Sequence, residues 1–324
     1  MNYIDMHCDT LMKAWGKKWP DIYDRPEMMV DIRRLLRGGC KAQFFAIFLP
    51  SPKMKERMGL AQMDDDDYIN QLYRIFCTTL EQHGDEVAQA KSLVQMHENT
   101  SQGKLSAILT MEDGRSVDGK MEKLDHYYNM GVRVIGLTWN QENCFGAPNS
   151  RDASIMAKGL TDFGKDAIIR MNELGMGIDV SHLSDGGFWD VAQLTQKPFF
   201  ATHSNCRSLN PHPRSMTDEM IRALADKGGV MGVNFCPAFL IHDVENNRAD
   251  CDMLAAQLRY MINAGGEDCA AIGTDFDGMN GELEIASADK MPNLFIALEH
   301  AGFTPREIEK IAFANAERVI ADVF

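Results

Sequence analysis

The sequence has few basic residues and no long apolar run. It contains 33 Lys and Arg against 47 Asp and Glu, which gives a formal charge of −14 over 324 residues. An acidic surface of this kind repels phosphate backbones and anionic lipid headgroups. The longest wholly apolar run covers residues 44–50, far short of the roughly 20 residues that a membrane-spanning helix requires. We therefore expect neither nucleic-acid binding nor membrane association.

Closely paired cysteines, a signal-peptide pattern and linker sequences are also missing. The eight cysteines form no CxxC pair, and residues 1–13 carry charges where a secretion signal needs an apolar centre. This pattern predicts reduced thiols in a cytoplasmic protein. No Pro/Ser-rich or low-complexity stretch divides the chain, so a single domain spanning residues 1–324 is expected.

What recurs along the chain is a short apolar segment followed by an amphipathic one, a rhythm typical of alternating strands and helices. Eight segments are predicted as strands: 3–8, 42–49, 105–111, 132–138, 176–180, 198–202, 230–234 and 270–274. No GxGxxG loop follows the first of them, as it would in a dinucleotide-binding sheet. Eight strands in about 320 residues favour the α/β class and a (β/α)8 barrel of the TIM type over an open sheet.

Side chains that bind metals follow five of the predicted strands. His7 and Asp9 lie two residues apart at the end of the first strand, so strand alternation places both on one face. Glu112 follows the third strand, in phase with Ile108 and Thr110. The strands of a parallel barrel bring such residues to one opening, where barrel enzymes keep their chemistry.

Two histidines and an aspartate complete the set. His182 is expected in phase with Ile178 on the fifth strand, and His203 in phase with Ala201 on the sixth. Asp275 follows the eighth strand directly. Burying such polar groups without partners would cost several kcal/mol each. A metal site avoids that cost.

The mixture of ligand types indicates which metal would bind. Imidazoles and carboxylates, with no required thiolate, suit Zn²⁺ or a similar first-row divalent ion. Six groups are too many for one tetrahedral ion with an open position, so two ions that share a bridging carboxylate are predicted. Such a pair holds a hydroxide at neutral pH and polarises a carbonyl group. The predicted reaction is therefore hydrolysis.

The chain resembles the membrane dipeptidase (renal dipeptidase) family, peptidase family M19, in five motifs: IDMHCDT, TMEDG, GIDVSH, ATHSNCRSLNPHPRSMTD and IGTDFDG. The resemblance spans nearly the whole sequence. It implies a distorted (β/α)8 barrel that cleaves dipeptides, holds two zinc ions per chain and forms homodimers. The metal ligands that it implies are His7, Asp9, Glu112, His182 and His203.

The resemblance also implies individual roles in catalysis and substrate binding. Glu112 would bridge the two metals, and Asp275 would move the proton between the bridging water and the leaving amine. Arg214 would hold the substrate's terminal carboxylate, a task suited to a planar bidentate donor. One position departs from the animal enzymes, which have a histidine after Leu-Thr on the fourth strand. Here Trp139 and Asn140 follow, and these two N–H donors are expected to line the substrate site without carrying a proton as imidazole does.

Two alternatives to a dipeptidase differ in class. Other dinuclear barrel hydrolases, such as lactonases, phosphotriesterase-like enzymes and deaminases, commonly carry His-x-His on the first strand and often a carboxylated lysine on the fourth. This chain has His7-x-Asp9 and no lysine in 132–138. The second alternative, a catalytically silent barrel that binds a ligand, is disfavoured by the full set of ligand residues together with Asp275.

The remaining histidines and one acidic run receive structural interpretations. Six histidines are interpreted as solvated or structural: His83, His97, His126, His212, His242 and His300. Of these, His212 lies two residues before Arg214, in the expected substrate loop, and is the one with a chance of contacting substrate. The four acids at 64–67 precede a helical pattern, so they are interpreted as a helix N-terminus rather than a metal cluster.

Overall fold

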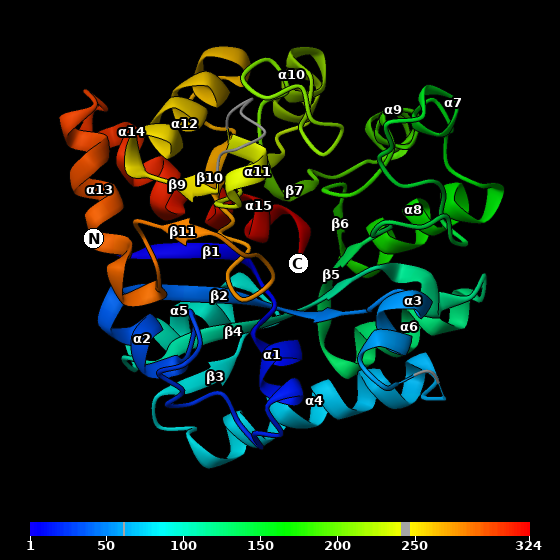
Figure 1. Ribbon diagram of the computed structural model, residues 1–324, viewed down its shortest axis with the longest axis horizontal. Coiled ribbons are helices and arrows are strands. Elements are labelled where there is room, and N and C mark those ends of the chain that lie inside the picture. The colour runs from blue at the N-terminus through cyan, green and yellow to red at the C-terminus, as the bar shows by residue number, and fades with distance from the viewer. Residues whose placement is uncertain (61, 241–246) are drawn as a thin grey trace.

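The computed structural model describes residues 1–60, 62–240 and 247–324, so His242 lies outside the described residues. Eight parallel strands form a closed ring, because β2 and β4, at the two ends of the row β2-β1-β10-β8-β7-β6-β5-β4, also pair with each other. The ring consists of β1 (Tyr3–Cys8), β2 (Cys40–Phe48), β4 (Leu105–Glu112), β5 (Val132–Gly136), β6 (Gly177–Asp179), β7 (Phe200–Ser204), β8 (Val230–Val233) and β10 (Ala270–Ile272) (Figure 1). The predicted (β/α)8 barrel is confirmed.

Each of the eight predicted strands overlaps one strand of the ring. The pattern did not indicate three short strands: β3 (Val87–Gln89), which pairs with the start of β4, and the mutually paired β9 (Arg248–Ala249) and β11 (Glu282–Leu283). They are too short to show a hydrophobic period. The ring is irregular where β1 meets β10 and where β6 meets β7, since each pairing has a single register pair.

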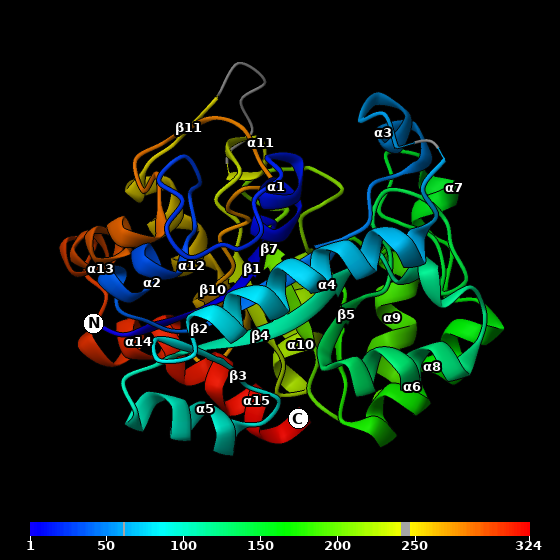
Figure 2. The same cartoon turned by 90° about the horizontal axis from the view of Figure 1, so that it is seen from below.

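Helices surround the ring. In chain order the helical elements are α1 (Thr10–Gly16), α2 (Ile32–Gly38), α3 (Pro52–Arg57), α4 (Asp65–Gln82), α5 (Leu93–Ser101), η1 (Gly114–Val117), α6 (Met121–Met130), α7 (Ala153–Met156), α8 (Asp162–Leu174), α9 (Asp185–Leu194), α10 (Asp218–Asp226), α11 (Pro237–Leu240), α12 (Cys251–Gly265), η2 (Ala288–Lys290), α13 (Met291–His300), α14 (Pro305–Glu309), η3 (Lys310–Ala314) and α15 (Asn315–Val323). Figure 2 shows the short helices α1, α3, α7 and α11 at one end of the barrel and α5 and α15 at the other. Within the described part of the chain, no helix has both the length and the apolarity to cross a membrane.

Local sequence signals explain several helix boundaries. The acidic run at 64–67 begins α4 as predicted, because the Asp64 side chain accepts a hydrogen bond from the Asp67 N–H and the next three acids occupy the first turn. Residues 114–120 match the GxxxxGK part of a phosphate loop. However, Met121 stands where Ser or Thr would follow, and the segment opens with the single turn η1. It therefore lacks the metal-binding hydroxyl of a phosphate loop.

Apolar side chains fill the half of the barrel in which the strands begin, and they exclude water from it. Inward-facing residues from seven strands form one buried cluster, which includes Met6, Phe44, Ile108, Val134, Phe200, Val230 and Ala271. Helix α15 closes this end by adding Val319, Ile320 and Val323 to the same cluster. The other end, where the strands terminate, is therefore the one open to substrate.

Two strand irregularities aim histidines into the barrel. Asp5 and Cys8 of β1 pair with Gln43 and Phe45 of β2, so three steps on β1 oppose two on β2. This bulge turns His7 inward, although Met6 already faces the barrel interior.

A bulge of the same kind lies in β7. Ala201 and Ser204 pair with Met231 and Val233. Phe200 belongs to the buried cluster inside the barrel. Ala201 belongs to the outer cluster, which lies between the strands and the surrounding helices. The expected phase of His203 with Ala201 is therefore wrong, and the bulge is what points the imidazole inward.

The expected phase of His182 is also wrong. Strand β6 ends at Asp179, and Ile178 belongs to the outer cluster. His182 lies in a turn beyond the strand. The turn, not strand alternation, therefore directs its ring.

Candidate active site

Glu112 lies at the centre of the open end, between two groups of nitrogen ligands. Its Oε2 is 3.4 Å from Nε2 of His7 on one side. Its Oε1 is 2.9 Å from Nε2 of His182 and 3.8 Å from Nε2 of His203 on the other. The two carboxylate oxygens thus face different histidines, which is the arrangement expected of a bridging ligand.

The histidines converge closely enough to share ions. The Nε2 atoms of His182 and His203 are 3.2 Å apart, and the His203 ring stacks on that of His7 with centroids 3.8 Å apart. Burial, reinforced by the nearby cations of Arg214 and His7, lowers the pKa of both His182 and His203 well below the usual range. These two rings are therefore neutral at pH 7, the form in which imidazole binds metals.

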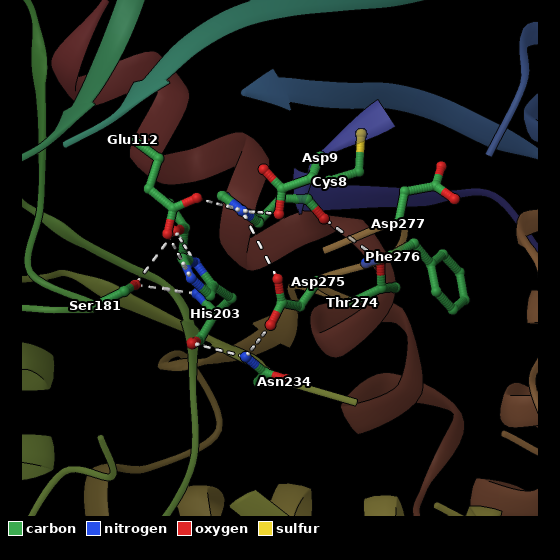
Figure 3. Close-up of polar contacts among 12 residues, drawn as sticks. Cys8, Asp9, Glu112, Ser181, His203, Asn234, Thr274, Asp275, Phe276 and Asp277 are labelled. Atoms are coloured by element: carbon green, nitrogen blue, oxygen red, sulfur yellow. Dashed lines mark hydrogen bonds and ion pairs between the residues drawn. The ribbon is translucent and has the colours of Figure 1, made fainter. Parts of the chain in front are cut away.

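Two aspartates close the other side of the site. Asp9 Oδ2 lies 3.6 Å, and Asp275 Oδ1 3.9 Å, from Nε2 of His7. Figure 3 shows Glu112, Asp9, Asp275 and His203 directed toward one common space. Burial and the charge of Asp9 raise the pKa of Glu112 to about 7, and the same two causes raise that of Asp275 to about 6. Three buried acids so close together favour a cation between them.

The donor atoms fit divalent metals. Ligand atoms of His7, Glu112 and His203, and separately of His7, Asp9 and Asp275, lie within 4.8 Å of one another. Nε2 of His7 and Oδ1 of Asp9 are buried without a hydrogen-bond partner. Buried polar atoms are nearly always paired, and coordination would satisfy both.

A buried relay orients His203. Its Nδ1 is 2.8 Å from Thr202 Oγ1, which donates its own hydrogen to Asp179 Oδ2 at 2.6 Å. Asp179 Oδ1 also accepts from the Ser181 hydroxyl and from the Thr202 N–H. Because the threonine hydroxyl is committed to Asp179, it accepts from Nδ1–H and leaves Nε2 of His203 unprotonated. Sequence reasoning missed Thr202 and Asp179, although both lie in motifs that carry ligands.

Asp275 is held by its neighbours in a strained turn. It has φ +62°, and Asn234 Nδ2 donates to its Oδ2 at 2.9 Å, which leaves Oδ1 facing His7. The preceding Thr274 is fixed by Asp5, which accepts from both its N–H and its hydroxyl. Positive φ in a non-glycine residue is uncommon and concentrates at functional sites. The supporting Asn234 and Asp5 gave no signal in the sequence.

Arg214 is buried beside the histidines. Its Nη1 donates to the carbonyl of Ser181 and to the Ser204 hydroxyl, and its Nη2 donates to the carbonyl of His203 at 3.1 Å. Its Nε has no hydrogen-bond partner. Burial lowers the pKa of Arg214 against the opposing influence of Asp275 and Glu112, yet a guanidinium stays charged. The Nε–H is thus a buried donor without a partner, on a residue that lines the cleft.

A cleft of about 380 Å³ opens above these groups. Asp9, Glu112, His182, Arg214 and Asp275 line it. Trp139, Asn140 and His212 also line it. The Trp139 ring lies 6.4 Å from that of His182. A cleft this size is at the small end of the range for small-molecule sites.

The barrel and its cluster of imidazoles and carboxylates define a metal-dependent hydrolase. The family model described as membrane dipeptidase (peptidase family M19) matches residues 1–323. The chain therefore belongs to this family and is a metallo-dipeptidase, as the motifs predicted.

Individual relatives agree with this assignment. An uncharacterised protein from the pqqA 5′ region of Klebsiella pneumoniae is 38% identical over 230 residues, covering 68% of this chain and 83% of its own length. An uncharacterised dipeptidase of Schizosaccharomyces pombe is 28% identical over 307 residues, covering 89% and 71%. A metallopeptidase of Rhodobacter sphaeroides, solved with a phosphinate mimic of L-Ala-D-Ala, superimposes with TM-score 0.86 at 23% identity, covering 100% and 99% of the two chains. This last likeness concerns the fold.

Proposed function

We propose that this metallo-dipeptidase hydrolyses the peptide bond of dipeptides at a site of two zinc ions. The position of Glu112 carries the proposal, because its two oxygens face different histidines at 3.4 Å and 2.9 Å. One ion would take His7, Asp9 and one oxygen of Glu112, and the other would take the second oxygen with His182 and His203. When bound, such a pair supplies hydroxide at neutral pH and polarises the scissile carbonyl.

The chain's own groups supply proton transfer and orientation. Asp275 keeps one oxygen anchored on Asn234 and turns the other toward the ligand cluster, so we assign it the proton shuttle to the leaving amine. A carboxyl group held at this position can accept the proton and pass it on. Glu112 acts with it by holding the two halves of the site together.

Substrate binding is assigned to three further side chains. The unpaired Nε–H of Arg214 would hold the terminal carboxylate of the dipeptide. The indole N–H of Trp139 and the amide of Asn140, in the segment that follows β5, would donate to the substrate. Neither carries a proton as imidazole does, so proton transfer rests on Asp275.

Metal stoichiometry tests the bridge. Elemental analysis of protein loaded with zinc should give two ions per chain. Glu112→Gln should lower the affinity of both sites together, because one carboxylate serves both. Asp275→Asn should lose turnover, by about 10²- to 10⁴-fold, while it retains two ions. A Glu112→Gln protein that keeps both ions and full activity would refute the bridging role.

Amidated substrates test the role of Arg214. Free dipeptides should be cleaved far better than dipeptide amides, and Arg214→Lys should reduce kcat/KM for the free forms by at least about tenfold. The same change should affect the amides much less. Equal cleavage of both forms before and after the substitution would show that Arg214 does not bind a carboxylate.

A further inference from the structure

Arg214 and a group of apolar side chains line opposite sides of the active-site cleft. In the ring, β7 and β2 are separated by three strands in either direction, so the segments that follow them face each other across the opening. Arg214 follows β7, whereas Phe48 ends β2 and Met54 lies on α3 just beyond it. Arg214 therefore lies opposite Phe48 and Met54, with Glu112 between them.

Several apolar side chains line the cleft together. We call this group the apolar wall, and it consists of five side chains: Met12, Phe48, Met54, Trp139 and Met279. Phe48 pairs in register with Glu112, so its side chain shares the face of that carboxylate. Its ring meets that of Trp139 edge to face at 4.9 Å. The wall therefore begins directly beside the ligand cluster.

The strands that supply the wall are neighbours. Met12 follows β1, Phe48 and Met54 follow β2, Trp139 follows β5 and Met279 follows β10. In the ring these strands form one arc, β10-β1-β2-β4-β5, whose other member carries Glu112. The arc of the wall also carries Asp9 after β1 and Asp275 after β10, on the side of the ligand cluster. The remaining arc, β6-β7-β8, carries Arg214, with the ring of Phe239 after β8 beside it. None of the five wall residues is charged, and of the five only Trp139, through its indole N–H, can donate a hydrogen bond.

We propose that the apolar wall selects dipeptides whose amino-terminal residue has a large apolar side chain. The proposal rests on the proposed function: a dipeptide whose carboxylate lies at Arg214 and whose peptide bond lies over Glu112 directs its amino-terminal residue toward β2. There, Phe48 and Met54 meet the substrate's first side chain. The wall buries an apolar group favourably and leaves a charged one without an ion-pair partner.

The composition of the wall predicts a preference for a class of side chains rather than for one residue. Three of its five members are methionines, which are unbranched and repack around different shapes. Leucine, methionine and phenylalanine should therefore all be accepted as first residues, whereas glycine leaves the wall unfilled and aspartate is rejected.

Steady-state kinetics of the zinc-loaded protein test this preference. We expect kcat/KM for Leu-Ala and Phe-Ala to exceed that for Gly-Ala by at least about tenfold, the scale that a few methylenes give in an apolar pocket. Asp-Ala should be poorer than Gly-Ala. In the reversed series, the ratio of Ala-Leu to Ala-Gly should be clearly smaller.

Two substitutions locate the effect on the wall. Met54→Gln keeps the length of the side chain and makes it polar, so the ratio of Leu-Ala to Gly-Ala should fall several-fold. Met58→Gln is the matched control, because Met58 lies at the end of the same helix but lines a different hollow, with Trp15 and Trp19. The ratio should stay unchanged there. Met279→Gln repeats the test from β10 if α3 does not tolerate the first change.

The outcomes distinguish a failure of this inference from a failure of the proposed function. Hydrolysis of Gly-Ala and Leu-Ala at equal rates, or selection only in the reversed series, would overturn the role of the wall and leave the dipeptidase intact. A ratio that Met58→Gln lowers as much as Met54→Gln would also overturn it. Failure of the zinc-loaded protein to cleave any dipeptide in either series would overturn both.

Discussion

Replacing Gly278 with alanine should dislodge one metal ligand while leaving every ligand residue unsubstituted. A methyl carbon built at Gly278 would lie 1.9 Å from Oδ2 of Asp9 and 3.0 Å from Oδ1 of Asp275. Carbon and oxygen atoms approach to roughly 3.3 Å without repulsion, so the Asp9 carboxylate must retreat by about 1.4 Å. Gly278 does not have a positive φ, so this steric effect is not mixed with backbone strain.

The expected losses follow from that displacement. Metal sites tolerate errors of about 0.2 Å in ligand distance, so Asp9 would cease to coordinate in its present position. We expect the affinity for one of the two ions to fall by at least about 10- to 100-fold. The value of kcat/KM should fall by about 100-fold, the effect of a misplacement near 1 Å.

Chelator competition and dipeptide kinetics measure the two effects. Gly16→Ala is the control, because Gly16 lies in α1, the helix that Asp9 precedes, and a methyl carbon there meets nothing within 4 Å. That variant should bind metal and turn over substrate normally. A Gly278→Ala protein with two tightly held ions and full activity would show that Asp9 is not a ligand in the position described.

Three further predictions concern the relay, the metal and pH. Thr202→Val should weaken zinc binding by about 10- to 100-fold, whereas Thr202→Ser restores it, and the melting temperature of the metal-free protein serves to exclude a general folding defect. Removal of zinc by a chelator should lower the melting temperature, since free metal at 100 times its Kd contributes about 2.7 kcal/mol; no shift would argue against binding in the fold. Burial and the cations of Arg151, Arg214 and Arg207 lower the pKa of His212 to about 4, whereas the unfolded value is about 6.5. The unfolded chain then binds the extra proton, so stability falls as the pH drops from about 6.5 to about 4, and His212→Asn should lose less melting temperature over that window than the unmodified protein.

The barrel could be predicted from the sequence because the hydrophobic patterns of its strands and helices each lie within a short stretch of the chain. Strands buried on both faces appear as apolar runs, and the helices between them show an apolar stripe every third or fourth residue. Signals at helix ends, such as the Asp64 cap and the Thr304 capping box, fix boundaries without tertiary information. The short β3, β9 and β11 depend on a partner strand, so no hydrophobic pattern indicates them.

The directions of the ligands could be predicted only in part. Glu112 is the last residue of the regular strand β4, and alternation from Ile108 places it inside the barrel as expected. For His182 and His203, the assumption of regular alternation failed. Neither the turn beyond β6 nor the bulge in β7 shows as a hydrophobic pattern, because both depend on how neighbouring strands pair. The relay from Asp179 through Thr202 likewise requires two strands to meet at one residue pair.

These irregularities coincide with the chemistry for a physical reason. In a regular barrel, inward positions alternate in layers, and the layer beneath the site is filled with Met6 and Phe200. Without a bulge, His7 and His203 would each follow an inward residue and point outward into the helices. An extra residue in β1 and another in β7 reverse that alternation near the carboxyl end of each strand. The barrel thus keeps an apolar layer beneath the site and, one residue further along the strands, presents two imidazoles whose rings stack at 3.8 Å beside the carboxylate of Glu112.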